Sequence, residues 1–155
     1  MPAGNATGAP TLLVIGYGNT LRSDDGAGVR VAEAMAAMQL PGVEAVAVHQ
    51  LLPEHAEWLA RVDRAVFVDA RVTDEGAEPT IEPIGEPAAP HVPGHVADPG
   101  ALLAMARLLY GRAPRAWLLA VPGVAFAIGE GLSATAARGV TRAIDQIAGL
   151  IANDA

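Results

Sequence analysis

Short apolar runs alternate with segments of helical periodicity along most of the 155-residue chain, which limits the folds available to it. A short, uniformly apolar run suits a buried strand, whereas apolar residues at helical spacing suit an amphipathic helix. Strand-like runs occupy residues 11–17, 43–49, 65–70 and 116–122. Helical spacing occupies residues 26–40, 53–61, 99–110 and 134–151. We therefore expect a three-layer α/β/α sandwich with a mostly parallel, twisted sheet of about five strands.

Several residues mark where these elements begin and end. Pro41 and Gly42 follow the first helical segment and end it. Asp98 followed by Pro99 is typical of a helix start, because the aspartate caps the first turn and proline suits the first helical position. Ser133 is placed to cap the last helix in the same way.

The segment 71–97 interrupts the alternation. Its five prolines exclude a long helix, although Thr80–Ile84 suits a short edge strand. The segment is longer than most loops, so it is either a flap over a substrate or a surface excursion. Neither a repeat nor a linker divides the chain, and we expect a single domain over residues 1–155, with residues 1–10 flexible.

Missing residue types exclude many reaction mechanisms. The chain has no cysteine, all ten of its Lys and Arg residues are arginine, and its only serines are Ser23 and Ser133. Thiolate nucleophiles, disulfides, cysteine-bound metals and Schiff bases are therefore impossible. A serine nucleophile would have to be Ser23 or Ser133. Carboxylates, hydroxyls and four histidines remain for chemistry: His49, His55, His91 and His95.

The net charge and the hydropathy of the chain limit the classes of partner that we expect it to bind. Seventeen acidic residues against ten basic ones give a net charge of −7, so we expect no nucleic-acid partner. The arginines are scattered rather than clustered, and no uncharged apolar stretch reaches the roughly 20 residues that span a bilayer, so we expect no membrane partner. Without a recognisable signal sequence, the expected location is the cytoplasm. We expect a monomer, because the helical segments leave no apolar face uncovered.

Acidic residues follow two of the expected strands. The loop at 16–28 begins with Gly16 and Gly18, as in a dinucleotide fingerprint, but has Leu21 at the third glycine position and adds two adjacent acids, which disfavours a bound pyrophosphate. Those acids either cap the next helix or face the crevice at the carboxyl ends of the strands. Asp69 ends another strand at the same edge. With a histidine from the proline-rich segment, such oxygen and nitrogen ligands suit zinc or nickel.

The string GYGNTLRSDDGAG at 16–28 resembles the signature of the [NiFe]-hydrogenase maturation endopeptidases. The strings FVDA at 67–70 and GEGLS at 129–133, and the segment 94–121, are similar to further elements of that family in the same order. The resemblance implies a nickel-recognising site formed by Asp25, Asp69 and His95. For the histidine, His91 is the alternative.

The resemblance also implies an activity. Members of this family remove a C-terminal extension from the hydrogenase large-subunit precursor after nickel has been inserted. The expected enzyme is thus a nickel-dependent endopeptidase, neither a serine nor a cysteine protease, in which Asp25, Asp69 and His95 are both catalytic and metal-binding. The precursor supplies the nickel, and no organic cofactor is expected. The alternatives are a non-catalytic, metal-dependent binding module for a hydrogenase subunit and a small nucleotide-binding α/β domain.

Overall fold

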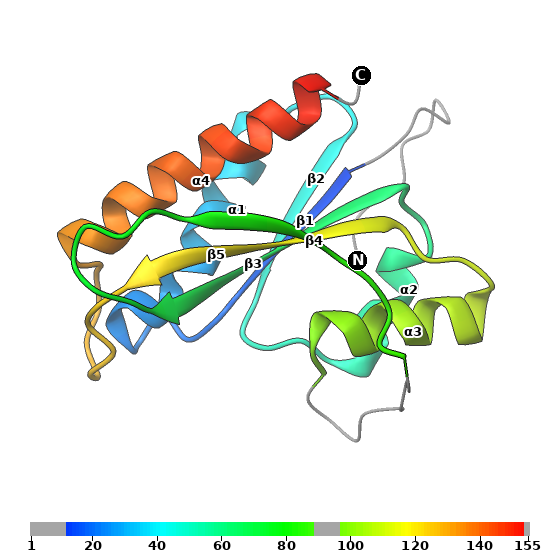
Figure 1. Ribbon diagram of the computed structural model, residues 1–155, viewed down its shortest axis with the longest axis horizontal. Coiled ribbons are helices and arrows are strands. Elements are labelled where there is room, and N and C mark those ends of the chain that lie inside the picture. The colour runs from blue at the N-terminus through cyan, green and yellow to red at the C-terminus, as the bar shows by residue number, and fades with distance from the viewer. Residues whose placement is uncertain (1–11, 89–96, 154–155) are drawn as a thin grey trace.

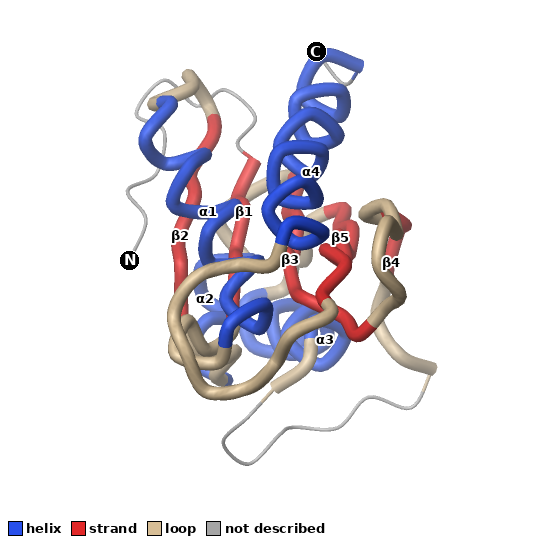
Figure 2. Tube along the Cα trace, turned by 90° about the vertical axis from the view of Figure 1, so that its left-hand side faces the viewer, coloured by secondary structure: helices blue, strands red, loops and turns tan. Residues whose placement is uncertain are grey.

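A computed structural model describes residues 12–88 and 97–153. It contains a five-stranded sheet with the strand order β2-β1-β3-β5-β4, which Figure 2 shows from one edge to the other. Neighbouring strands are parallel except for β4, which is antiparallel to β5. The bounds of the strands are β1 (Leu12–Tyr17), β2 (Val43–Val48), β3 (Arg64–Val72), β4 (Thr80–Ile84) and β5 (Arg115–Gly123).

Helices cover both faces of this sheet (Figure 1). One face carries α1 (Ala27–Met38) and α4 (Ala134–Asn153), and the other carries α2 (Ala56–Leu59) and α3 (Pro99–Tyr110). A 3₁₀ turn precedes each of two helices: η1 (Ser23–Gly26) leads into α1, and η2 (Pro53–His55) leads into α2. The expected three-layer sandwich with a mostly parallel sheet is confirmed. The expectation of flexible ends at residues 1–10 lies outside the described residues.

Side-chain alternation along the strands divides the core into two layers. Leu13 and Ile15 of β1 are buried with Phe67 of β3 against α2 and α3. Leu12 and Val14 lie on the opposite face, against α1 and α4. Because both faces are covered, the central strands contain almost no polar residues except at their ends.

The predicted helix ends are mostly confirmed. The Asp98 carboxylate accepts a hydrogen bond from the Ala101 amide at 2.8 Å and caps α3, which ends at Gly111 with φ +81°. The helix α1 ends earlier than Pro41 and Gly42 suggested, because Gln39 already adopts the left-handed conformation with φ +48°. The strand at Thr80–Ile84 is the edge strand that its proline indicated.

The last turn of α3 departs from the sequence-based expectation. Leu108, Leu109 and Tyr110 are 72%, 59% and 51% exposed. The neighbouring α2 spans only four residues, so it does not cover this end of the longer α3. The prediction that the helices leave no apolar face uncovered is therefore wrong at this turn. The expectation of a monomer depended on that prediction.

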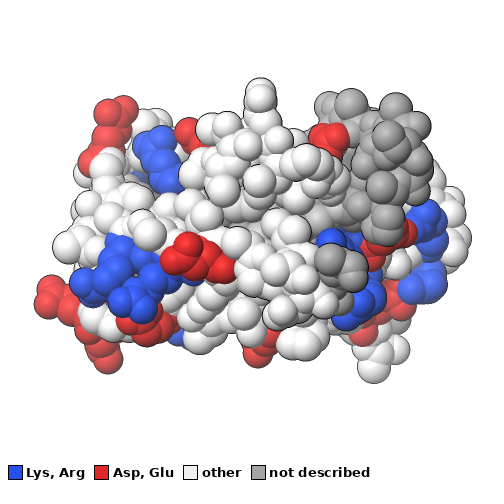
Figure 3. All heavy atoms as spheres, turned by 90° about the horizontal axis from the view of Figure 1, so that it is seen from above, with Lys and Arg blue, Asp and Glu red and all other residues white. Residues whose placement is uncertain are grey.

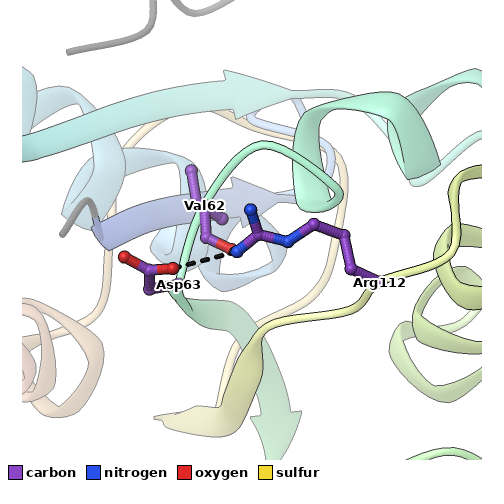
Figure 4. Close-up of polar contacts among 3 residues, drawn as sticks. All are labelled: Val62, Asp63 and Arg112. Carbon is purple, nitrogen blue, oxygen red and sulfur yellow. Dashed lines mark hydrogen bonds and ion pairs between the residues drawn. The ribbon is translucent and has the colours of Figure 1, made fainter. Parts of the chain in front are cut away.

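An exposed ion pair connects two turns at the amino ends of the parallel strands. Arg112 donates to the Asp63 carboxylate at 2.9 Å and to the Val62 carbonyl at 3.3 Å, which joins the turns that precede β3 and β5 (Figure 4). Acidic and basic side chains are interspersed on the face drawn in Figure 3. Over residues 12–88 and 97–153, no helix is both long and apolar enough to cross a bilayer.

Candidate active site

The loop after β1 folds back sharply on itself. Gly18 has φ +143°, which disfavours any side chain, and a Cβ there would overlap the carbonyl oxygen of Asp25. This close approach brings η1 back over the end of β1. The loop therefore presents Asp25 at the carboxyl edge of the sheet, where ligands bind in sheets of this kind.

Asp25 is half-buried and held by its own loop. Its Oδ2 atom accepts a hydrogen bond from the Asn19 amide at 2.8 Å. The Asn19 side chain in turn accepts from the Leu21 amide at 2.9 Å, which stabilises the turn between them. The orientation of the Asp25 carboxylate is thus fixed by the backbone of the loop.

Asp69 lies within reach of the Asp25 charge. Burial, with a smaller contribution from the negative charge of Asp25, raises the pKa of Asp69 to about 6, although hydrogen bonds from the Ala70 amide and the Tyr17 hydroxyl act to lower it. Burial also raises the pKa of Tyr17, as do the charges of Asp69 and Asp98. The structure therefore brings together two of the three predicted site residues, as a pair of mutually repelling carboxylates.

Asp24 has a role different from that of its neighbour. Its side chain is fully buried and accepts hydrogen bonds from the amides of Val124, Ala125 and Ser133 and from the Ser133 hydroxyl, at 2.7–3.0 Å. Burial would raise the pKa of Asp24, but these hydrogen bonds outweigh it and hold the pKa below its usual value. Neither η1 nor α1 has a side-chain cap, so the alternative in which one of these acids caps the helix is wrong.

Both serines have structural roles. Ser133 binds Asp24 and, as predicted, caps α4, accepting from the Ala136 amide at 3.2 Å. The Ser23 hydroxyl donates to the Ala127 carbonyl at 2.8 Å. The Ser23 amide also donates to the Gly129 carbonyl at 2.9 Å, and the Gly129 amide donates to the Leu21 carbonyl at 2.8 Å. These hydrogen bonds connect the loop before α4 to the loop after β1. Each serine hydroxyl therefore connects two segments of the chain that are distant in sequence.

The histidines fall into three groups. His55 is buried, its Nδ1 accepts from the Leu52 amide at 3.0 Å, and its ring stacks on Trp58, so it belongs to the core. His49 is exposed and lines a shallow hollow of about 200 Å³ beside Gly18. His91 and His95, the two candidates for the third ligand, lie outside the described residues. Within residues 12–88 and 97–153, no three acidic or histidine side chains group as a metal site.

Two residues near this site were missed from the sequence: Tyr17, which neighbours Asp69, and Asp98, whose charge raises the pKa of Tyr17. Tyr17 was assigned only as the end of an apolar run, and Asp98 only as a helix cap. The register of the sheet contained a signal for Tyr17, because Leu13, Ile15 and Tyr17 alternate along β1 as Ala65, Phe67 and Asp69 do along β3. A continuous apolar run hides this alternation, since both faces of the strand are buried.

Comparisons with solved structures identify proteins of the same fold. The hydrogenase maturating endopeptidase HybD from E. coli superposes with a TM-score of 0.72 and 23% identity, covering 93% of each chain. The [NiFe] hydrogenase maturation proteases HybD and HycI from Thermococcus kodakarensis both superpose with a TM-score of 0.69, at 20% and 22% identity, covering 90% and 92% of this chain and 98% and 93% of theirs. No family model and no curated protein matches the sequence. The chain therefore has the fold of the solved hydrogenase maturation proteases.

Proposed function

We propose that this protein is an endopeptidase that removes the C-terminal extension of a [NiFe]-hydrogenase large-subunit precursor after nickel insertion. The observation that carries the proposal is the convergence of Asp25 and Asp69 at the carboxyl edge of the sheet, in a fold shared with maturation proteases. The sequence motif that contains Asp25 supports the same assignment. The chain has no cysteine, and both its serines are engaged in structural hydrogen bonds.

In this proposal, nickel enters as part of the substrate. Two repelling carboxylates attract a divalent cation, because the cation stabilises the ionised form of both. Asp25 and Asp69 would bind it together with His95, which precedes the first turn of α3. Two carboxylates and an imidazole suit a borderline cation such as nickel. A site that binds the free ion weakly would discriminate a nickel-loaded precursor from an empty one.

The carboxylates also suit the hydrolytic step. Without a cation bound to it, Asp69 has a pKa raised to about 6, so it is a stronger base than an ordinary aspartate and is still mostly ionised at neutral pH. It could accept the proton of a water molecule that attacks the scissile carbonyl. The nickel ion of the precursor could polarise that carbonyl or activate the water. Neither role requires an organic cofactor. We propose the cytoplasm as the location of the protein.

The test is cleavage of a purified precursor. The protein is incubated with nickel-loaded and nickel-free large subunit, and mass spectrometry follows the loss of the C-terminal peptide. Cleavage of the loaded form alone supports the proposal. Complex formation without cleavage would instead favour the non-catalytic binding module, and specific affinity for NAD or ATP would favour a nucleotide-binding domain.

Variants then test the site. Asp25→Ala, Asp69→Ala and His95→Ala should each abolish cleavage while the far-UV circular dichroism spectrum remains that of the wild type. Glu33→Ala is a matched control, because Glu33 lies on α1 in an exposed pair with Arg30. An active His95→Ala variant together with an inactive His91→Ala variant would transfer the ligand role to His91.

A further inference from the structure

Tyr17 and Asp69 lie side by side on neighbouring parallel strands: Tyr17 ends β1, and Asp69 lies near the carboxyl end of β3, which continues to Val72. Gly16 of β1 pairs with Val68 of β3, so the residues that follow them lie next to each other. Both side chains continue the face of the sheet that carries Ile15 and Phe67 and is covered by α2 and α3. The register thus places the Tyr17 phenol beside the Asp69 carboxylate, where its hydroxyl acts as a donor that lowers the pKa of Asp69.

We propose that Tyr17 is a positioning residue for Asp69: its hydroxyl holds one carboxylate oxygen and leaves the other directed toward the substrate. This inference depends on the proposed function, since it assigns to Asp69 a role toward the precursor. The Tyr17 ring packs against the buried cluster under α2 and α3, so the position of the hydroxyl is set by the core.

An aspartate in this position needs such a donor. Rotation about the last side-chain bond of aspartate is broad, so packing alone does not fix the carboxylate plane. The Asp25 charge repels the Asp69 carboxylate and would turn it away from the shared site. A hydrogen bond from a neutral phenol to a carboxylate is strong enough to oppose this repulsion.

Asp25 is held in a comparable way. Its Oδ2 accepts from the Asn19 amide, whereas Asp69 accepts from the Ala70 amide and the Tyr17 hydroxyl. Asp25 is thus oriented from within its own loop, whereas Asp69 is oriented by the next amide of its own strand and by a side chain of the neighbouring strand β1. In Asp69 the side-chain donor is removable without altering the backbone, which makes the inference testable.

The experiment compares Tyr17→Phe with Tyr110→Phe. Both substitutions remove one hydroxyl and keep the ring, and Tyr110 is the only other tyrosine in the chain, 51% exposed at the end of α3. With nickel-loaded precursor, Tyr17→Phe should lower kcat about 10- to 100-fold with KM unchanged, because misorientation of a reacting group mainly affects the transition state. Tyr110→Phe should retain both constants.

Crystal structures of the free proteins provide a readout that does not depend on cleavage. In Tyr17→Phe, the Asp69 carboxylate should rotate away from its wild-type orientation or occupy two orientations, with its backbone unmoved. An unmoved carboxylate, an unchanged kcat or an effect confined to KM would each overturn the inference. A wild-type protein that does not cleave the precursor would refute the proposed function, and the crystallographic comparison would still decide whether Tyr17 orients Asp69.

Discussion

Replacement of Asp24 by asparagine should destabilise the protein strongly. The carboxylate accepts four hydrogen bonds inside the protein, three on Oδ2 and one on Oδ1. The asparagine side chain has a single acceptor oxygen, so its NH₂ group would face at least one of the N–H or O–H donors that now bind the carboxylate. The hydrogen bonds that remain would be to a neutral acceptor instead of a charged one. A lost charge-assisted bond contributes about 1.5–3 kcal/mol, and a donor left unsatisfied costs about 1–3 kcal/mol more. We expect the free energy of unfolding to fall by about 3–5 kcal/mol.

The assay is urea unfolding followed by tryptophan fluorescence. With a denaturant dependence of about 2 kcal/mol/M, the midpoint should fall by about 1.5–2.5 M. The matched control is Asp63→Asn, which removes an exposed ion pair with Arg112 at the opposite edge of the sheet and should cost at most about 1 kcal/mol (Figure 4). A loss for Asp24→Asn no larger than that of the control would refute the reasoning.

The effect of Asp24→Asn should also depend on pH. The hydrogen bonds hold the pKa of Asp24 lower in the folded protein than in the unfolded chain. A carboxylate of this kind stabilises the fold fully above its unfolded pKa of about 3.9, and that contribution is lost as the pH falls through the folded value. The difference in stability between wild type and Asp24→Asn should therefore be constant from pH 5 to 7 and shrink below about pH 4. A difference that grew on acidification would contradict the assignment.

Three further predictions test other parts of the structure. Gly18→Ala should reduce both stability and cleavage, because a Cβ there overlaps a backbone carbonyl, whereas Gly149→Ala in α4, where the site is open, should leave both unimpaired in thermal melts and peptidase assays. Leu102→Ala should cost about 2–5 kcal/mol and Leu108→Ala under about 0.5 kcal/mol in urea unfolding, because the first side chain is fully buried and the second is 72% exposed on the same helix. Burial lowers the pKa of His55, so the stability that depends on its neutral ring should be lost as the pH falls below about 6.5, and His55→Gln should flatten this pH dependence of the urea midpoint.

The layers of the fold could be predicted from the sequence because hydrophobic periodicity depends on local spacing alone. The run that became β1 and the Asp98 cap of α3 both follow from residues within one element. The prediction of a helix at 53–61 was less accurate, because this segment forms one 3₁₀ turn followed by one α-helical turn. The exposed end of α3 could not be predicted, because it depends on how far a helix distant in the sequence extends beside it.

The site could be predicted only where topology determines it. Asp25 follows β1, and Asp69 lies near the carboxyl end of β3. The carboxyl ends of parallel strands lie at one edge of a sheet, so the proximity of the two acids follows from the predicted fold. The partners of Asp24 lie about one hundred residues further along the chain, and nothing in its local sequence distinguishes a buried anchor from a helix cap. Tyr17 required the register between β1 and β3, which the apolar composition of β1 conceals.

The 3₁₀ geometry of η1 explains why two adjacent acids have different roles. With three residues per turn, successive side chains point about 120° apart, so Asp24 and Asp25 face different surroundings. Asp24 points inward, where its hydrogen bonds anchor the loop before α4. Asp25 accepts a single hydrogen bond among the described residues, and its charge raises the pKa of Asp69. The buried acid thereby fixes the turn that presents its neighbour, and exchanging their environments would require the backbone of η1 to unwind.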